Sequence, residues 1–176
     1  MGSRMKQVRL GACTVGALAV ATLVLSTTPA AASGTYSGRA YVYGASTYTD
    51  DWNDEGIVST GSNTTSNATC LWQKILWADG KLASSGIDGI FGSGTAAATK
   101  NWQSDWGLTA DGSAGQNTWT EAGNWLDDLD SDGVVDSYVG TSHVISVSRD
   151  SDGRYAFYDA GGSKRLAGYD YETCTS

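Results

Sequence analysis

Hydrophobic residues recur every three or four positions in three central segments, which is the spacing of one face of an α-helix. The segments are 70–80, 96–106 and 119–129; Gly80 closes the first and Gly107 follows the second, where a helix would end. Gly123 weakens the third. The predicted apolar faces consist of Leu71, Ile75 and Ala78, of Ala98, Trp102 and Trp106, and of Trp119, Ala122 and Leu126. The pattern predicts a small three-helix bundle.

Apolar and polar residues alternate in the last part of the chain, as they do along a half-buried β-strand. HVISVSR, beginning at His143, and YAFYD, beginning at Tyr155, flank a turn rich in Asp and Gly and predict a β-hairpin. Residues 165–171 fit a third strand, and residues 39–43 fit a short strand near the front. We expect the front strand to join the others in one small antiparallel sheet, which makes the chain an α+β protein.

The first 32 residues have the order of a secretory signal peptide. Three basic residues precede an uncharged, small and apolar stretch over 10–25, and an A-x-A pattern ends at Ala32. A membrane anchor is the alternative, although the apolar stretch is short for a membrane span. The signal peptide predicts a secreted protein, extracellular or associated with the cell wall.

Cleavage after residue 32 would leave 144 residues in three parts. These are a front strand with a polar loop (33–66), a helical domain (67–126) and a C-terminal β-hairpin extension (127–176). Cleavage removes three of the 11 basic residues and none of the 19 acidic ones, so the remaining chain has a net charge of −11. Such acidity argues against nucleic acid or an anionic membrane as partner, because phosphates are bound by Lys and Arg.

Two of the three cysteines, Cys70 and Cys174, lie in the mature chain. An exported protein meets an oxidising environment, so we expect these two to pair. Two separately buried thiols are the alternative. A bridge would close a loop of about 100 residues, which is worth about 4–5 kcal/mol in the chain-entropy model, and would attach the C-terminal tail to the helical part.

Two octets share the pattern D-G-x-x-G-x-x-T: DGIFGSGT, and DGSAGQNT 23 residues later. Asp-Gly favours a turn, because the carboxylate accepts a backbone N–H two residues on and glycine tolerates positive φ. The second glycine ends the loop, and the Thr hydroxyl can satisfy an N–H group in the first turn of a helix. Each octet therefore predicts a turn that starts a helix. The residues of this motif are Asp88, Gly89, Gly92 and Thr95, and Asp111, Gly112, Gly115 and Thr118.

With both octets in register, residues from about 67 to 126 resemble the peptidoglycan-binding domain of secreted bacterial wall hydrolases. The ordered match also includes Gln73, Gln103 and a closing Thr-Trp pair that ends at Trp119. The departures from the family pattern are Trp72 for Leu, Thr99 for Val, Trp102 for Phe and Ala114 for a larger apolar residue. The resemblance implies a three-helix fold and peptidoglycan, or a related wall glycan, as the partner.

Seven tryptophans in so short a chain suggest sugar binding, since an indole face suits the C–H side of a pyranose. Trp102 and Trp119 occupy core positions of the family. Trp77 and Trp106 stand where the family is usually polar, so they either line a glycan groove or lie under the added sheet. The candidate ligand-binding residues are Trp77, Trp106, Gln73 and Gln103.

The segment DLDSDGVVD has the D-x-D-x-D-G spacing of a calcium loop, in which alternate carboxylates converge on one cation. Val139, however, stands where such loops carry a bidentate acid, and Asp-Ser-Asp-Gly recurs over 150–153, inside the predicted hairpin turn. A weak calcium site and a solvated turn both remain open, and no other cofactor is indicated. The candidate ligands are Asp128, Asp130, Asp132 and Asp136.

The sequence contains no recognisable catalytic set. His143 is the only histidine, whereas a zinc hydrolase needs several ligands, and no Gly-x-Ser-x-Gly elbow is present. No pair of acids is singled out for glycoside hydrolysis. We therefore expect a non-catalytic protein that binds peptidoglycan through its helical module, alone or with a protein partner. The alternatives are a wall hydrolase with an unrecognised catalytic part, and a structural or partner-binding protein on the same scaffold.

Overall fold

The computed structural model describes residues 37–45 and 47–175, so the predicted signal peptide lies outside the described residues. The elements in chain order are η1 (Tyr48–Asn53), α1 (Asn67–Ala78), η2 (Ser84–Gly86), α2 (Ser93–Asp105), α3 (Gln116–Gly123), β1 (Leu126–Asp127), β2 (Ser137–Val139), β3 (Val144–Arg149), β4 (Tyr155–Tyr158) and β5 (Lys164–Leu166). Helices and an antiparallel sheet are both present, which confirms the predicted α+β class. Among the described helices, none combines the length and apolar character that crossing a membrane requires.

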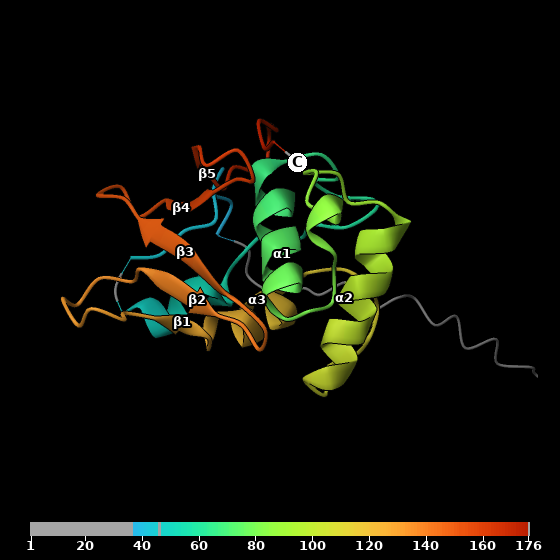
Figure 1. Cartoon of the computed structure of the whole chain (residues 1–176), viewed down its shortest axis with the longest axis horizontal. Coiled ribbons are helices and arrows are strands. Elements are labelled where there is room, and N and C mark those ends of the chain that lie inside the picture. The colour runs from blue at the N-terminus through green and yellow to red at the C-terminus, as the bar shows by residue number, and fades with distance from the viewer. Residues whose placement is uncertain (1–36, 46, 176) are drawn as a thin grey trace, which may run out of the picture. The chain divides into compact units, whose positions relative to one another are not determined.

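Helix α1 lies between the sheet and α2 (Figure 1). Its N-cap is Ser66, whose hydroxyl accepts the N–H of Thr69 at 3.0 Å. Because the helix has packed neighbours on two sides, its apolar residues go nearly all the way round it rather than forming one stripe. The fully buried members are Ala68, Cys70, Leu71, Trp72, Ile75, Leu76 and Ala78.

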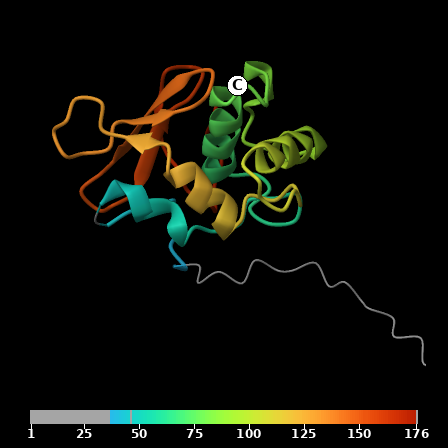
Figure 2. The ribbon, with the colours of Figure 1, turned by 90° about the horizontal axis from the view of Figure 1, so that it is seen from below.

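Helix α3 is shorter than the sequence predicted. The prediction of a helix over 119–129 is wrong beyond Gly123, and the chain continues as strand β1, in which Leu126 pairs with Tyr138 of β2. Gly123 lies against Trp52 of η1, where an added Cβ would come within 3.2 Å of the Trp52 Cβ. Figure 2 shows η1, drawn in teal, beside α3. Close packing at this glycine, followed by strand pairing, ends the helix.

The sheet is antiparallel with the strand order β1-β2-β3-β4-β5. The predicted hairpin is confirmed as β3 and β4, with Val147 opposite Phe157. Alternation along β3 buries Ile145 and Val147 and exposes Val144. Strands β1 and β2 were not predicted, because the chain around them reads as an acidic loop, and β5 is shorter than the segment expected.

The front segment joins the sheet through single bridges rather than as a full strand. Tyr41 pairs with Gly168 and Tyr43 pairs with Arg154, both antiparallel. Val42 between them is fully buried, and its N–H donates to the carbonyl of Ala167 at 2.9 Å. The expected association of the front of the chain with the C-terminal sheet is therefore present, over fewer residues than predicted.

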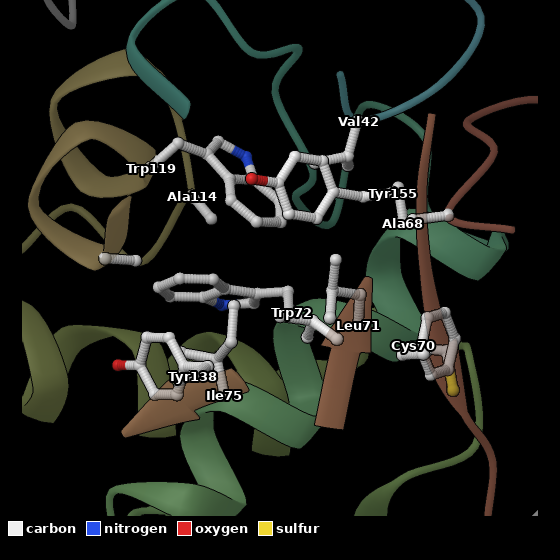
Figure 3. Close-up of a cluster of buried hydrophobic side chains, with 14 of the residues drawn as sticks. Val42, Ala68, Cys70, Leu71, Trp72, Ile75, Ala114, Trp119, Tyr138 and Tyr155 are labelled. Carbon is white, nitrogen blue, oxygen red and sulfur yellow. The ribbon is translucent and has the colours of Figure 1, made fainter. Parts of the chain in front are cut away.

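The core is built around tryptophan rings. Trp119 and Trp72 lie 5.3 Å apart between ring centroids, and Trp72 and Trp102 lie at the same distance, in edge-to-face geometry that aromatic pairs favour. Trp52 adds a fourth ring, 5.5 Å from Trp119. Figure 3 shows Trp72 and Trp119 among the buried side chains, edge to face. All four indoles are fully buried, so the core joins η1 to all three α-helices.

Asp79, at the end of α1, connects the helices to the sheet. Its carboxylate accepts the Trp102 Nε1–H of α2 at 2.7 Å and the Tyr138 hydroxyl of β2 at 2.6 Å. It also accepts the N–H of Thr141, in the β2–β3 turn, at 2.8 Å. The sheet therefore packs against the helical module through a buried carboxyl side chain and not through apolar contacts alone.

Candidate functional site

The first octet is held in shape by a buried glutamine of α1. The Gln73 Nε2 donates to Asp88 Oδ1 at 2.8 Å and to Thr95 Oγ1 at 3.1 Å, and it also lies 3.1 Å from the Ile90 carbonyl. The Gln73 Oε1 accepts the backbone N–H groups of Asp88 and Gly89 at 3.0 and 2.8 Å. One amide therefore satisfies several polar groups of the turn at once.

The second octet repeats this arrangement with a glutamine of α2. The Gln103 Nε2 donates to Asp111 Oδ1 at 2.9 Å and to Thr118 Oγ1 at 3.0 Å, and it lies 3.0 Å from the Ser113 carbonyl. The Gln103 Oε1 accepts the Gly112 N–H at 2.9 Å. The two loops are therefore built by the same physical device, a glutamine on the preceding helix.

These contacts give the two glutamines a structural role. Gln73 and Gln103 are 0% and 1% exposed, and both ends of each amide are engaged by their loops. A wall ligand cannot reach such groups without opening the loop. Of the four candidate ligand-binding residues, these two hold the loops in shape, and Gln103 also lines the hollow beside the second octet.

The predicted turn chemistry is largely as expected. Gly89 and Gly112 have φ values of +72° and +83°, which only glycine adopts at little cost. The predicted role of the two threonines needs correction. Helices α2 and α3 begin after Gly92 and Gly115, without a side-chain cap, and the threonine hydroxyls accept from the glutamines instead of from the helix N–H groups.

The C-terminal tail covers the first octet. A Cβ on Gly89 would lie 2.7 Å from the Cγ of Glu172, so the tail passes directly over the turn. Cys70 and Cys174 form the predicted disulfide, with a Cα–Cα distance of 6.4 Å. The Asn67 side chain adds hydrogen bonds to the tail. The tail therefore passes over the first loop at Gly89, while Ile90 of the same loop stays exposed.

The second octet keeps a small hollow open beside it, of about 70 Å³. Leu108 supplies a half-buried apolar wall, while Thr109 and Asn117 are exposed at its rim. Gln103 and Thr118 lie beneath and fix the loop. Polar groups at the rim and an apolar wall suit a ligand that carries both amide or hydroxyl groups and aliphatic carbon.

Trp77 is covered in part by a residue of the C-terminal extension, and Trp106 by a residue that follows α3. The Trp77 ring stacks on His143, which precedes β3, at 4.1 Å and 15°. The Trp106 ring packs against Trp125, which precedes β1, at 4.8 Å and 45°. Both Trp77 and Trp106 remain half-buried, so each contributes only part of one face to the surface.

Two buried carboxylates lie near the front of the chain. Asp51 accepts two hydrogen bonds from Arg149 and one from the Tyr155 hydroxyl. Burial raises the pKa of Asp51, against the opposing effects of Tyr155 and Arg149. Glu55 accepts the Tyr43 N–H and the Tyr169 hydroxyl, and burial raises its pKa to about 8. Their partners belong to the fold, so these acids stabilise the attachment of the front segment.

The β1–β2 connection brings three predicted calcium ligands together. Carboxylate oxygens of Asp128, Asp130 and Asp136 all lie within 4.8 Å of one another, and these three could hold a cation. Asp128 Oδ2 accepts the Gly133 N–H at 2.7 Å, while Asp132 turns its carboxylate to the Val134 N–H. The position expected for a bidentate acid lies in strand β2 as Val139.

Comparison with protein families agrees with this geometry. Residues 65–121 match the family described as "Putative peptidoglycan binding domain", which confirms the resemblance predicted from the two octets. The matched segment contains both loops and both glutamines, and it leaves the front segment and the C-terminal sheet outside. Searches of curated proteins and of solved structures gave no match. The helical part is therefore similar in sequence to this family over residues 65–121.

Proposed function

We propose that this is a secreted, non-catalytic protein that binds peptidoglycan through the second octet of its helical module. The observation that carries the proposal is the difference between the two loops of the matched family segment. The tail lies over the first loop at Gly89, whereas the second has an open hollow bounded by Leu108 and Asn117. The signal-peptide pattern of residues 1–32 supports export to the wall.

The residues at this hollow fit a wall glycopeptide. Thr109 and Asn117 offer hydroxyl and amide groups, and Asp111 and Ser113 lie at the same rim. Leu108 provides contact for methyl or methylene groups. The Gln103 network holds the loop before a ligand arrives, which reduces the entropy lost on binding. The hollow is small, so we expect it to take one residue or sugar substituent.

Sedimentation with purified insoluble peptidoglycan tests the proposal. The mature protein should move to the pellet in a saturable manner, and Asn117→Leu should lower the bound fraction several-fold by removing the rim amide. Asn101→Leu is the matched control, because Asn101 is also an exposed helical asparagine of the module but does not line the hollow. Protein that stays in the supernatant at saturating peptidoglycan would reject wall binding.

The absence of a hydrolytic role is part of the proposal. The buried acids that could serve as a catalytic pair, Asp51 and Glu55, are occupied by Arg149, Tyr155 and Tyr169. Incubation of the pure protein with peptidoglycan should release no new muropeptides. Release of products would favour the hydrolase alternative instead. Recovery of a protein partner without wall binding would favour a scaffold role.

Calcium is proposed only as an aid to the loop over 128–136. The Asp132 N–H lowers the pKa of Asp130, but the Asp132 and Asp136 charges and the Asp128 carboxyl raise it overall. A bound cation would offset this repulsion between neighbouring carboxylates. We expect calcium at millimolar concentration to raise the melting temperature relative to chelator, because calcium sites of extracellular modules have dissociation constants of about 10⁻⁴–10⁻³ M. Asp130→Asn should lose this response, and an unchanged wild-type melting temperature would identify a plain turn.

A further inference from the structure

A second hollow lies outside the family segment, where α3 runs into β1. It has a volume of about 290 Å³ and is lined by Asn124, Trp125, Leu126, Asp127 and Val139. This is near the lower end of small-molecule sites, at about 300 Å³. All five residues follow the matched segment, which ends at residue 121, so the hollow belongs to the part that the sheet adds.

Trp125 is held in a fixed position in this hollow. Its backbone N–H donates to the Ala122 carbonyl at 3.0 Å, and its backbone carbonyl accepts the N–H of Val139 in β2 at 2.9 Å. The Trp106 ring supports the indole at 4.8 Å, and Trp106 in turn lies 5.9 Å from the buried Trp102. The half-buried indole is therefore the outer end of the aromatic core, and it loses little conformational entropy when a ligand packs on it.

The polar residues beside Trp125 indicate the class of ligand. Asn124, which precedes Trp125, is exposed and offers an amide donor and acceptor. Asp127, two residues after Trp125, adds acceptor oxygens. An aromatic face next to such groups matches a pyranose, which presents C–H groups on one side and hydroxyls at its edge. A purely apolar ligand would make no use of the amide or the carboxylate.

The charge of the hollow excludes anionic ligands. None of its five lining residues is basic, and Asp127 is acidic. Glu121 also approaches, since its carboxylate accepts the Asn124 side-chain N–H at 3.3 Å. Phosphate or carboxylate groups would meet repulsion here, because binding them needs Lys, Arg or clustered N–H donors.

We propose that this hollow is a subsite for a neutral N-acetylhexosamine ring, with Trp125 as the stacking face and Asn124 and Asp127 as hydrogen-bonding partners. The inference rests on the proposed wall-binding function for the source of the sugar. It goes beyond that function by giving the added sheet a part in recognition. The sheet residue Val139 both forms one wall and fixes the Trp125 backbone, so the subsite exists only when sheet and module are packed together.

The subsite is tested by calorimetric titration of the mature protein with a soluble β-1,4-linked tetramer of N-acetylglucosamine. The wild type should bind, and Trp125→Ala should weaken binding by at least about tenfold, as expected for an aromatic anchor. Because removal of Trp125 also loosens Trp106, the exposed Asn124→Leu is the second variant, and it should weaken binding without lowering the melting temperature. Asn101→Leu, at an exposed asparagine of α2 that lines neither hollow, should bind the tetramer like the wild type.

Absence of tetramer binding by the wild type, or binding that neither Trp125→Ala nor Asn124→Leu weakens, would overturn the subsite. Binding of poly(glycerol phosphate) in place of the tetramer would overturn it too. Failure here is separable from failure of the proposed function: sedimentation with peptidoglycan reports the module, and tetramer titration reports the hollow. A wild type that sediments without binding the tetramer refutes only the subsite. A wild type that binds the tetramer through Trp125 but stays in the supernatant refutes only the wall-binding proposal.

Discussion

At the scale of single residues, two of the four departures from the family pattern are hydrogen-bond partners. Trp72 and Thr99 replace two aliphatic residues of that pattern, and the structure joins them, because the Trp72 Nε1–H donates to Thr99 Oγ1 at 2.9 Å. Thr99 keeps a second bond, to the Thr95 carbonyl at 2.8 Å. A larger ring with a polar group was therefore accommodated together with a new acceptor, which avoids an unsatisfied donor in the core.

A double-mutant cycle should reveal this coupling. Thr99→Val alone leaves the Trp72 Nε1–H buried without an acceptor, so it should cost about 1–3 kcal/mol of unfolding free energy. Trp72→Phe combined with Thr99→Val should cost less than the sum of the single changes, by about 1 kcal/mol, since the donor is gone as well. Urea denaturation provides the values. The exposed Thr120→Val, combined with Trp72→Phe, is the control and should be additive; additivity of the Thr99 pair would contradict the bond.

Gln103 should prove a stability residue. Gln103→Ala removes a buried amide that holds the second loop. We expect the unfolding free energy to fall by roughly 2–4 kcal/mol, because several buried polar groups lose their hydrogen-bond partner. Gln103→Glu keeps the shape but places an oxygen against Asp111 Oδ1, and should also destabilise. Gln116→Ala, which breaks one exposed contact to the Asn53 carbonyl, should cost much less. Equal losses for Gln103→Ala and Gln116→Ala in urea would refute the loop-holding role.

At the scale of elements, the front segment and the sheet are joined by Glu55. This buried carboxyl receives the Tyr43 N–H at 2.6 Å and the Tyr169 hydroxyl at 2.7 Å. Tyr169 also accepts the Gly56 N–H at 3.0 Å. The contact links η1, the front bridge and the end of the sheet in one network, and it does so with a group whose pKa is raised by burial to about 8.

The Glu55 network should make stability fall as pH rises. The group titrates near 4.5 when unfolded and at about 8 when folded. Between these values the folded state holds a proton that the unfolded state has lost, so unfolding free energy should decrease by up to about 1.4 kcal/mol per pH unit and level off above the folded pKa. Glu55→Gln should reduce this slope in urea titrations between pH 5 and 8, a range set by those two pKa values. The same slope in both proteins would assign it to other groups.

At the scale of the whole molecule, the C-terminal end closes the structure back onto the first helix. The disulfide joins residues 104 apart in sequence, and the tail it fixes lies over the first octet. Asp79 makes the corresponding connection at the other end of α1, where it holds α2 and β2. Helix α1 is therefore attached to the C-terminal extension at both ends, which explains why the extension and the module form one unit.

Removal of the disulfide should cost about 4–5 kcal/mol, the chain-entropy value for a loop of about 100 residues. Cys70→Ala with Cys174→Ala should therefore lower the urea midpoint strongly. Reductant should produce the same change in the wild type and none in the double variant. A wild-type midpoint that does not respond to reductant, with free thiols confirmed by labelling, would show that tail packing alone supplies the stability.

The sequence by itself determined the helices, the two turns and the hairpin, because these depend on local periodicity, Asp-Gly chemistry and glycine conformations that neighbouring residues fix. It also predicted the disulfide partners, since only two cysteines remained after the signal peptide. Tertiary structure decided what local patterns do not contain. It ended α3 at Gly123, used Gln73 and Gln103 to hold the two loops by hydrogen bonds, and placed Trp125 beside β2. Each outcome depends on contacts between elements of the fold and not on the local sequence pattern.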